Sequence, residues 1–241
     1  MSCRVMGIVN VTPDSFSDGG QFFKPAEAIR RAKNLVAEGA DIIDLGGEST
    51  RPKATPITWS EEWARIEPVL RDLAVLKLGC LISVDTYHPE TAEYAIRAGA
   101  QIINCVYAEP IPEMLRVTSA TGKEVELVVP ASCWSGLQPS DLSRVYIDPM
   151  IGFGTTREED LALLRSIPEL AKKGRVLVGA SRKRIVKKLT GVEGAVGKNV
   201  GGNVAIAVWA ALSGASVVRV HDVRETVQAL RVVDALNKRE E

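Results

Sequence analysis

The sequence lacks an excess of charge of either sign, because 30 lysine and arginine residues balance 30 aspartate and glutamate residues. A broad basic surface for nucleic acid or anionic membranes is therefore not expected. The sequence also lacks any apolar run near the ~20 residues of a membrane span, and because a strand-like run lies within its first residues, no signal peptide is expected. We expect a soluble cytoplasmic protein whose partners are small molecules.

Cysteine is scarce, and its four copies at Cys3, Cys80, Cys105 and Cys133 form no Cys-x-x-Cys pair. This spacing favours free buried thiols in a reducing cytoplasm over disulfides or a zinc site. Linkers, low-complexity tracts and composition shifts are also missing. With 241 residues, 46% of them hydrophobic, the chain is predicted to form one domain over residues 1–241.

Glycines mark six junctions at which a helical apolar pattern gives way to a strand-like run, and these recur every ~20 to 40 residues. The junction glycines are Gly39, Gly79, Gly99, Gly122, Gly174 and Gly214. Eight strands are predicted to start near Cys3, Asp41, Cys80, Gln101, Glu124, Val145, Val176 and Ser216. Helices are predicted over 25–38, 60–76, 89–98, 111–121, 156–171, 200–213 and 223–237.

This alternation predicts an α/β fold, a (β/α)₈ TIM barrel. A doubly wound sheet is the competing fold, but no Gly-x-Gly-x-x-Gly follows the first strand. One connection is short, since only residues Ser132 to Arg144 separate strands five and six, and Gly136 and Pro139 leave room for one helical turn at most.

Polar side chains end seven of the eight predicted strands, whereas strand five ends only in Ser132. They are Asn10, Asp44 with Glu48, Asp85, Asn104, Asp148, Ser181 with Arg182 and Lys183, and Arg219 with His221. The carboxyl ends of barrel strands carry the active site. Solvated strand ends are the alternative, but so many polar residues at one rim favour a binding site.

The chemistry of this ring indicates two kinds of ligand group. A flat heterocycle with an amidine-like edge would fit one part of the ring. Hydrogen-bond acceptors there come from Asp85, Asn104 and Asp148, and donors come from the Asn104 amide and the Lys183 ammonium. Cationic or potentially cationic side chains on the rim, Arg51, Arg219 and His221, suit a phosphate group.

Two long motifs resemble the signature loops of the dihydropteroate synthase family. The first is Met6–Gly20, in which a strand-like run turns into a long polar loop, and the second is Gly46–Pro52. Shorter motifs follow in the family's order: Ser83–Thr86, Ile102–Asn104, Asp148–Pro149, Gly152–Gly154, Gly179–Lys183 and Arg219–Asp222. The resemblance spans nearly the whole chain.

The resemblance implies a homodimeric transferase of folate biosynthesis that joins 6-hydroxymethyl-7,8-dihydropterin pyrophosphate to 4-aminobenzoate. It implies that pyrophosphate leaves first, giving a pterin-stabilised carbocation that the amine attacks. The residues implied to hold the pterin are Asp85, Asn104, Asp148 and Lys183, of which Asp85, Asp148 and Lys183 are also catalytic. Those implied for pyrophosphate are Asn10, Arg219 and His221, with Mg²⁺ near Asn10, and those near the arylamine are Thr50, Arg51 and Ser181.

The sequence departs from the family pattern at four places. Cys105 replaces a usual Asp, Met150 a usual Gly and Thr155 a common Lys. The Met-His-Met-like stretch of strand five and its helix are missing, so Cys133 or Trp134 either forms the pterin wall or belongs to the core. A surface uncovered by the lost helix could face a partner subunit.

Three other functions stay open at this point. The altered strand-five region is compatible with a different arylamine or with a non-catalytic pterin-binding paralogue, although such a paralogue would not need the pyrophosphate set. A pterin-dependent, corrinoid-linked methyltransferase shares a barrel and an acidic pterin pocket. Methyltransferases of that kind generally lack the loop around Thr12–Ser15 and the Arg219–Asp222 ending.

Overall fold

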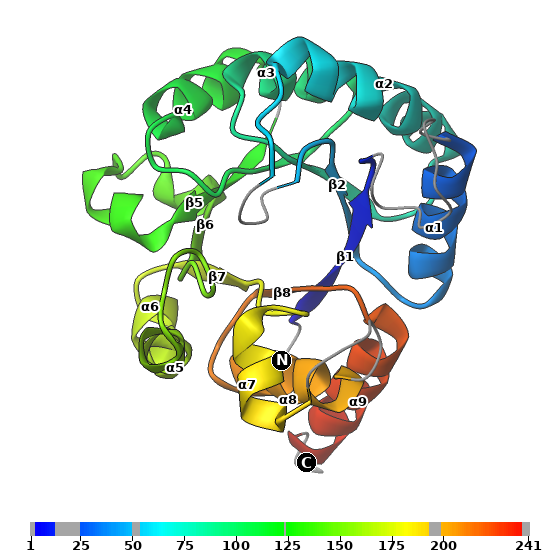
Figure 1. The fold of residues 1–241 in the computed structure, drawn as a ribbon. Helices are drawn as coiled ribbons and strands as arrows, with labels where there is room; N and C mark the ends of the chain where they lie inside the picture. The colour runs from blue at the N-terminus through cyan, green and yellow to red at the C-terminus, as the bar shows by residue number, and fades with distance from the viewer. Residues whose placement is uncertain (1–2, 13–24, 50–53, 123, 193–198, 238–241) are drawn as a thin grey trace.

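The computed structural model describes residues 3–12, 25–49, 54–122, 124–192 and 199–237. Eight parallel strands pair in chain order and close into a barrel, which Figure 1 shows end-on. The strands are β1 Arg4–Asn10, β2 Ile42–Gly46, β3 Leu81–Asp85, β4 Ile102–Asn104, β5 Glu126–Pro130, β6 Val145–Asp148, β7 Arg175–Val178 and β8 Val217–Val220. The predicted (β/α)₈ fold is therefore confirmed, and each strand starts within two residues of its predicted position.

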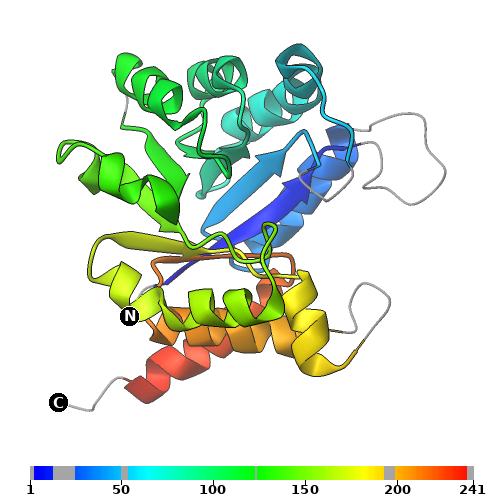
Figure 2. The ribbon, with the colours of Figure 1, turned by 60° about the vertical axis from the view of Figure 1, so that its left-hand side comes forward.

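Helices surround the barrel, as Figures 1 and 2 show. They are α1 Pro25–Ala37, α2 Trp59–Leu76, α3 Pro89–Ala98, α4 Ile111–Ala120, α5 Arg157–Arg165, α6 Ile167–Ala171, α7 Arg184–Thr190, α8 Val200–Leu212 and α9 Val223–Asn237. None of these described helices is both long enough and apolar enough to cross a membrane.

Two helix predictions are wrong in detail. The helix predicted over 156–171 is divided at Ser166 into α5 and α6, because Pro168 has no N–H to donate and its ring disfavours a continuous helix. The predicted helix ranges also omit α7, a helix of seven residues that ends where Gly191 takes a φ of 67°. So short an element carries little helical periodicity.

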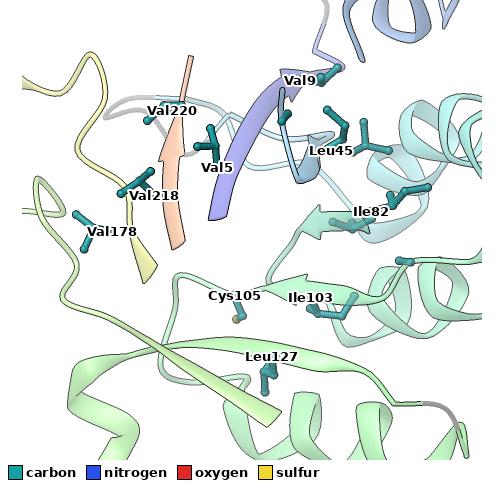
Figure 3. Packing of buried hydrophobic residues seen from close by; sticks show 14 of the residues in the cluster. Val5, Val9, Leu45, Ile82, Ile103, Cys105, Leu127, Val178, Val218 and Val220 are labelled. Carbon is teal, nitrogen blue, oxygen red and sulfur yellow. The ribbon is translucent and has the colours of Figure 1, made fainter. Parts of the chain in front are cut away.

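The core has two layers that follow from the alternation of side chains along each strand. Inside the barrel lie seven buried side chains: Met6, Ile42, Ile102, Val128, Tyr146, Leu177 and Val217. The opposite faces of the strands pack under the helices, and Figure 3 shows Val5, Val9 and Leu45 in this outer layer. Cys105 is buried there too and is shown in the same figure, so it packs as a small apolar side chain.

All four cysteines are free, as predicted, although only Cys105 is fully buried.

A polar network closes the amino-terminal end of the barrel. The Tyr146 hydroxyl donates to Glu126 at 3.0 Å and accepts hydrogen bonds from Arg4 and Arg175. The Arg175 guanidinium also lies 4.1 Å from the centre of the Tyr146 ring. Residues at this end of a TIM barrel serve stability rather than catalysis, and this network leaves the opposite end for the site.

The shortened connection after β5 forms two short 3₁₀ helices, Ala131–Gly136 and Leu142–Arg144. Trp134 packs against the outer core layer, and a Cβ on Gly174 would lie only 2.6 Å from its ring. Since Gly174 precedes β7, Trp134 lies toward the amino-terminal ends of the strands, away from the polar ring. Of the two sequence-based alternatives for Trp134, the structure therefore supports the core rather than a pterin wall.

Candidate active site

Strand register brings the predicted site residues together. Asn10 pairs with Gly46, Gly46 with Asp85, and Asp85 with Asn104. Paired residues of parallel strands point to the same face, so the side chains of Asn10, Asp85 and Asn104 share one layer at the carboxyl ends of β1, β3 and β4. Asp148 ends β6 at the position paired with Pro130 of β5.

Arg219 joins two carboxylates within the barrel mouth. Its Nε donates to Asp44 Oδ2 at 2.6 Å, and its Nη2 donates to Asp85 Oδ2 at 2.6 Å. The Asn104 amide lies 3.4 Å from the same oxygen of Asp44. The sequence placed Arg219 on the rim, whereas its guanidinium turns inward because the fully buried Asp44 and the nearby Asp85 attract it.

Asp44 is a site residue to which the sequence analysis gave no role. It was recognised only as one polar residue near the end of a strand. Asp44 pairs with Ser83, one layer below Asp85, so it supports the ring from beneath. Because Arg219 follows it by 175 positions, the pairing of these two residues gave no local sequence signal.

Burial and neighbouring charges alter the protonation of Asp85 and Asp148. Burial raises the pKa of Asp85 to about 7, although Arg219 and Lys183 act against this, and Asp44 and Asp148 raise it further. Burial likewise raises the pKa of Asp148, while Lys183 and the Met150 N–H, which donates to it at 2.7 Å, oppose the shift. Asp85 can therefore exchange a proton near neutral pH.

Lys183 reaches into the ring from the residue that precedes α7, in the connection after β7. Its ammonium donates to the Ile151 carbonyl at 2.6 Å and lies 4.1 Å from the centre of the Phe153 ring. Burial lowers the pKa of Lys183 to about 8, against the effect of Asp148 and Asp85. Phe153 is a second residue that the sequence analysis did not place in the site, although it lies in the quoted motif Gly152–Gly154.

Buried polar atoms remain without partners at this end of the barrel. Among the residues that the structure describes, Asn104 Oδ1, Asp44 Oδ1 and Ser83 Oγ have no hydrogen-bond partner. An unpaired buried polar group costs about 1–3 kcal/mol. A ligand with hydrogen-bond donors on a flat edge would satisfy such acceptors.

Ser181 and His221 form a separate pair beside the ring. Ser181 Oγ lies 3.1 Å from His221 Nδ1 and accepts a hydrogen bond from the His221 backbone N–H at 3.2 Å. Burial, followed by the charges of Arg182 and Arg219, lowers the pKa of His221 to about 3. This lowered pKa favours the neutral imidazole at physiological pH, so His221, which the sequence marked as potentially cationic, would contact phosphate as an N–H donor.

A second network supports this pair from behind. Arg182 Nη2 donates to Asp222 Oδ1 at 2.7 Å, and the Asn203 amide donates to Asp222 Oδ2 at 2.7 Å. The Arg182 backbone N–H in turn donates to Asn203 Oδ1 at 2.9 Å. These contacts join α8 to the segments that follow β7 and β8.

Two predicted site residues, Thr50 and Arg51, lie outside the described residues, as does most of the first signature loop. No group of three or more His, Cys, Asp or Glu residues suited to a metal ion occurs in the described part of the chain. The Asn10 amide oxygen lies beside Gly46 at the edge of the ring. One such oxygen fits an ion like Mg²⁺, which keeps several waters and takes further ligands from substrate phosphates.

The fold and this ring define a (β/α)₈ barrel with a polar ligand site at the carboxyl ends of its strands. Two overlapping stretches, residues 6–141 and 133–221, match the family described as Pterin binding enzyme. The chain therefore belongs to the pterin binding enzyme family.

Relatives cover nearly the whole chain. A dihydropteroate synthase of Mycobacterium leprae (strain TN) is 38% identical, over 96% of this chain and 93% of the relative. One from Neisseria meningitidis serogroup C is 40% identical, over 97% and 92%. Among solved structures, Xanthomonas albilineans dihydropteroate synthase with 4-aminobenzoic acid superimposes with a TM-score of 0.91 at 38% identity, covering 99% of this chain and 95% of that one.

Proposed function

We propose that the protein is a transferase of folate biosynthesis that condenses 6-hydroxymethyl-7,8-dihydropterin pyrophosphate with 4-aminobenzoate, giving 7,8-dihydropteroate and pyrophosphate. The ring of Asp85, Asn104, Asp148 and Lys183 at the barrel mouth carries this conclusion. The similarity to dihydropteroate synthases over nearly the full length supports it, including a Xanthomonas albilineans structure in complex with 7,8-dihydropteroate at a TM-score of 0.86.

The pterin is assigned to the acceptors and donors of this ring. Asp85, Asn104 and Asp148 would accept hydrogen bonds from the amino-pyrimidine edge, and Lys183 would donate to a ring nitrogen or oxygen. The unpaired Asn104 Oδ1 supports this role. Phe153, which already lies against the Lys183 ammonium, offers a flat surface for an aromatic ring.

The pyrophosphate is assigned to Asn10, Arg219 and His221. Arg219 is shared between Asp44 and Asp85, so it would contact the leaving group with a donor that those carboxylates do not use. His221 would donate a neutral N–H. Mg²⁺ near Asn10 would neutralise charge on the departing pyrophosphate.

The charge distribution supports departure of pyrophosphate before the amine attacks. Asp85 and Asp148 would stabilise the positive charge that develops on the pterin, while Arg219 and the His221 N–H would stabilise the leaving anion. Ser181 would lie near the arylamine, as would Thr50 and Arg51. Catalysis in this scheme comes from Asp85, Asp148 and Lys183, which hold the reacting heterocycle and its charge.

A homodimer and a cytoplasmic location belong to the same proposal. Trp209 and Leu212 on α8 are 52% and 46% exposed, and an apolar helix face of this kind supports association with a second subunit. The balanced charge of the chain fits small-molecule substrates rather than nucleic acid.

The test is turnover of the dihydropterin pyrophosphate with Mg²⁺ and 4-aminobenzoate, with the product identified by mass. Formation of dihydropteroate at an ordinary enzyme rate is the expected result. Binding or slow cleavage of the pyrophosphate ester without dihydropteroate would point to a larger arylamine. Absence of any binding would overturn the proposal and leave only the shared fold.

A further inference from the structure

The loop between β6 and α5 is held by a buried carboxylate from α5. Asp160 is only 1% exposed, and its Oδ1 accepts a hydrogen bond from the Gly152 N–H at 2.7 Å. The Thr155 hydroxyl also donates to this oxygen and accepts a hydrogen bond from the Gly152 N–H at 3.1 Å. Asp160 therefore organises the part of the loop that lies between Gly152 and Thr155.

This loop determines the surroundings of the Lys183 side chain. The ammonium binds the Ile151 carbonyl and lies over the Phe153 ring, and these two groups flank the residue that Asp160 holds. A Cβ on Gly152 would lie 2.8 Å from Lys183 Cδ, so the loop backbone packs directly on the lysine stem. Any displacement of Gly152 would consequently move both contacts of the ammonium.

The loop is also held in a backbone conformation that needs outside support. Met150 has a φ of 62°, Gly152 of 77° and Gly154 of 73°. A non-glycine residue in this region is strained by about 1–3 kcal/mol, and such strain persists only where neighbours determine the conformation. Asp148 binds the Met150 N–H on one side, and Asp160 binds the Gly152 N–H on the other.

We propose that Asp160 is a positioning residue for Lys183: by holding Gly152 and Thr155, it fixes the loop that presents the Ile151 carbonyl and the Phe153 ring to the ammonium. The proposal rests on the proposed function only in assigning Lys183 to the pterin. It also gives Thr155 a role, because its hydroxyl donates a hydrogen bond to the same Asp160 oxygen that binds Gly152.

Asp160 acts on Lys183 through its charge as well as through the loop. Among the described residues, the charged groups that act on Lys183 are Asp148 from β6, Asp85 from β3, Arg219 from β8 and Asp160 from α5. Asp160 raises the pKa of Lys183 and Arg219 lowers it. The Asp160 carboxylate therefore helps to keep the ammonium protonated in a half-buried position.

The test compares the wild-type enzyme with Asp160→Asn, Asp160→Ala and a matched control, Glu158→Gln, an acid on the same helix that is 77% exposed. An asparagine keeps an oxygen for Gly152 and Thr155 but removes the charge. Asp160→Asn is therefore expected to keep KM for the pterin substrate within about threefold, while the alkaline limb of kcat/KM moves down by about half a pH unit. Asp160→Ala is expected to raise that KM about tenfold, and Glu158→Gln to change neither quantity.

A purely structural role for Asp160 would lower the melting temperature of both variants without moving KM or the alkaline limb, and that result would overturn the proposal. Acetylation of Lys183 at a range of pH values, quantified by mass spectrometry without substrate, gives a second readout. An unchanged Lys183 titration in Asp160→Asn would overturn the electrostatic part. Because the acetylation measurement needs no substrate, it tests the role of Asp160 independently of the reaction. A wild-type protein that makes no dihydropteroate would therefore refute only the proposed function.

Discussion

Replacing Arg219 with alanine tests the central ionic cluster of the site. Arg219 is 18% exposed and donates two hydrogen bonds of 2.6 Å, to the fully buried Asp44 and to Asp85, which is 12% exposed. After Arg219→Ala, the Asn104 amide, at 3.4 Å, is the one hydrogen-bond partner that the described residues still offer to the Asp44 carboxylate. A carboxylate left in such surroundings has lost its water and its counter-charge together.

The expected cost follows from this geometry. Removing one partner of a buried ion pair typically destabilises a protein by about 3–5 kcal/mol. For a chain of this length, each kcal/mol corresponds to a shift in melting temperature of about 2–4 °C. Arg219→Ala is therefore expected to lower the melting temperature by about 6–20 °C, without any ligand present.

Thermal and urea unfolding measure this effect, with Arg97→Ala as the control. The Arg97–Glu93 pair on α3 is 68% and 44% exposed, so its loss is expected to cost less than about 1 kcal/mol. Adding Asp44→Asn to Arg219→Ala is expected to give a coupling energy of at least about 1 kcal/mol. If Arg219→Ala unfolds within about 1 kcal/mol of the wild type, Arg219 is not the counter-ion of a buried carboxylate.

Three further outcomes are expected. Asp85→Asn should lower turnover more than about tenfold, a loss above ~1.4 kcal/mol of transition-state stabilisation, and near-normal turnover would remove Asp85 from the mechanism. In rate measurements, kcat/KM should rise with pH through about 7 as Asp85 ionises and fall through about 8 as Lys183 loses its proton. A value of kcat/KM that is independent of pH across 6–9 would contradict both assignments. Met150→Gly should leave the free energy of unfolding in urea unchanged or raise it by up to about 1 kcal/mol. The substitution relieves the strain of the φ of 62°, and this gain offsets the greater flexibility of glycine in the unfolded chain. A clear loss of stability would mean that the methionine side chain supports the loop.

The fold was predictable because its signals are local. Each strand is a short apolar run, and most helices carry a repeat of apolar residues that spans several turns. Gly99, for example, ends α3 with a φ of 117° and donates to the carbonyls of Ala95 and Ile96, which is what a glycine after a helix predicts. The boundary at Ser166 was missed because the apolar repeat continues across Pro168, which divides the helix, and the seven residues of α7 are too few for a clear helical repeat.

The candidate site was predictable as a set of residues but not as a set of contacts. Asn10, Asp85, Asn104 and Asp148 follow from strand ends and from the rule that barrels place their sites there. The inward turn of Arg219 and the contribution of Asp44 depend on a pairing across 175 positions. The neutral state of His221 likewise depends on burial near Arg182 and Arg219, which only the closed barrel produces.

The departures from the family pattern are compatible with an intact site, because each has a local structural solution. Cys105 is buried in the outer layer of the core, on the opposite face of β4 from the ring. Met150 adopts a left-handed backbone, a conformation that glycine enters without strain, and the Thr155 hydroxyl donates a hydrogen bond to Asp160. The connection after β5 packs Trp134 against Gly174 near the start of β7, at the end of the barrel remote from Asp85 and Lys183. These departures thus lie outside the ring of Asp85, Asn104, Asp148 and Lys183. Strand register and the buried ion pairs keep the polar groups of that ring at one end of the barrel.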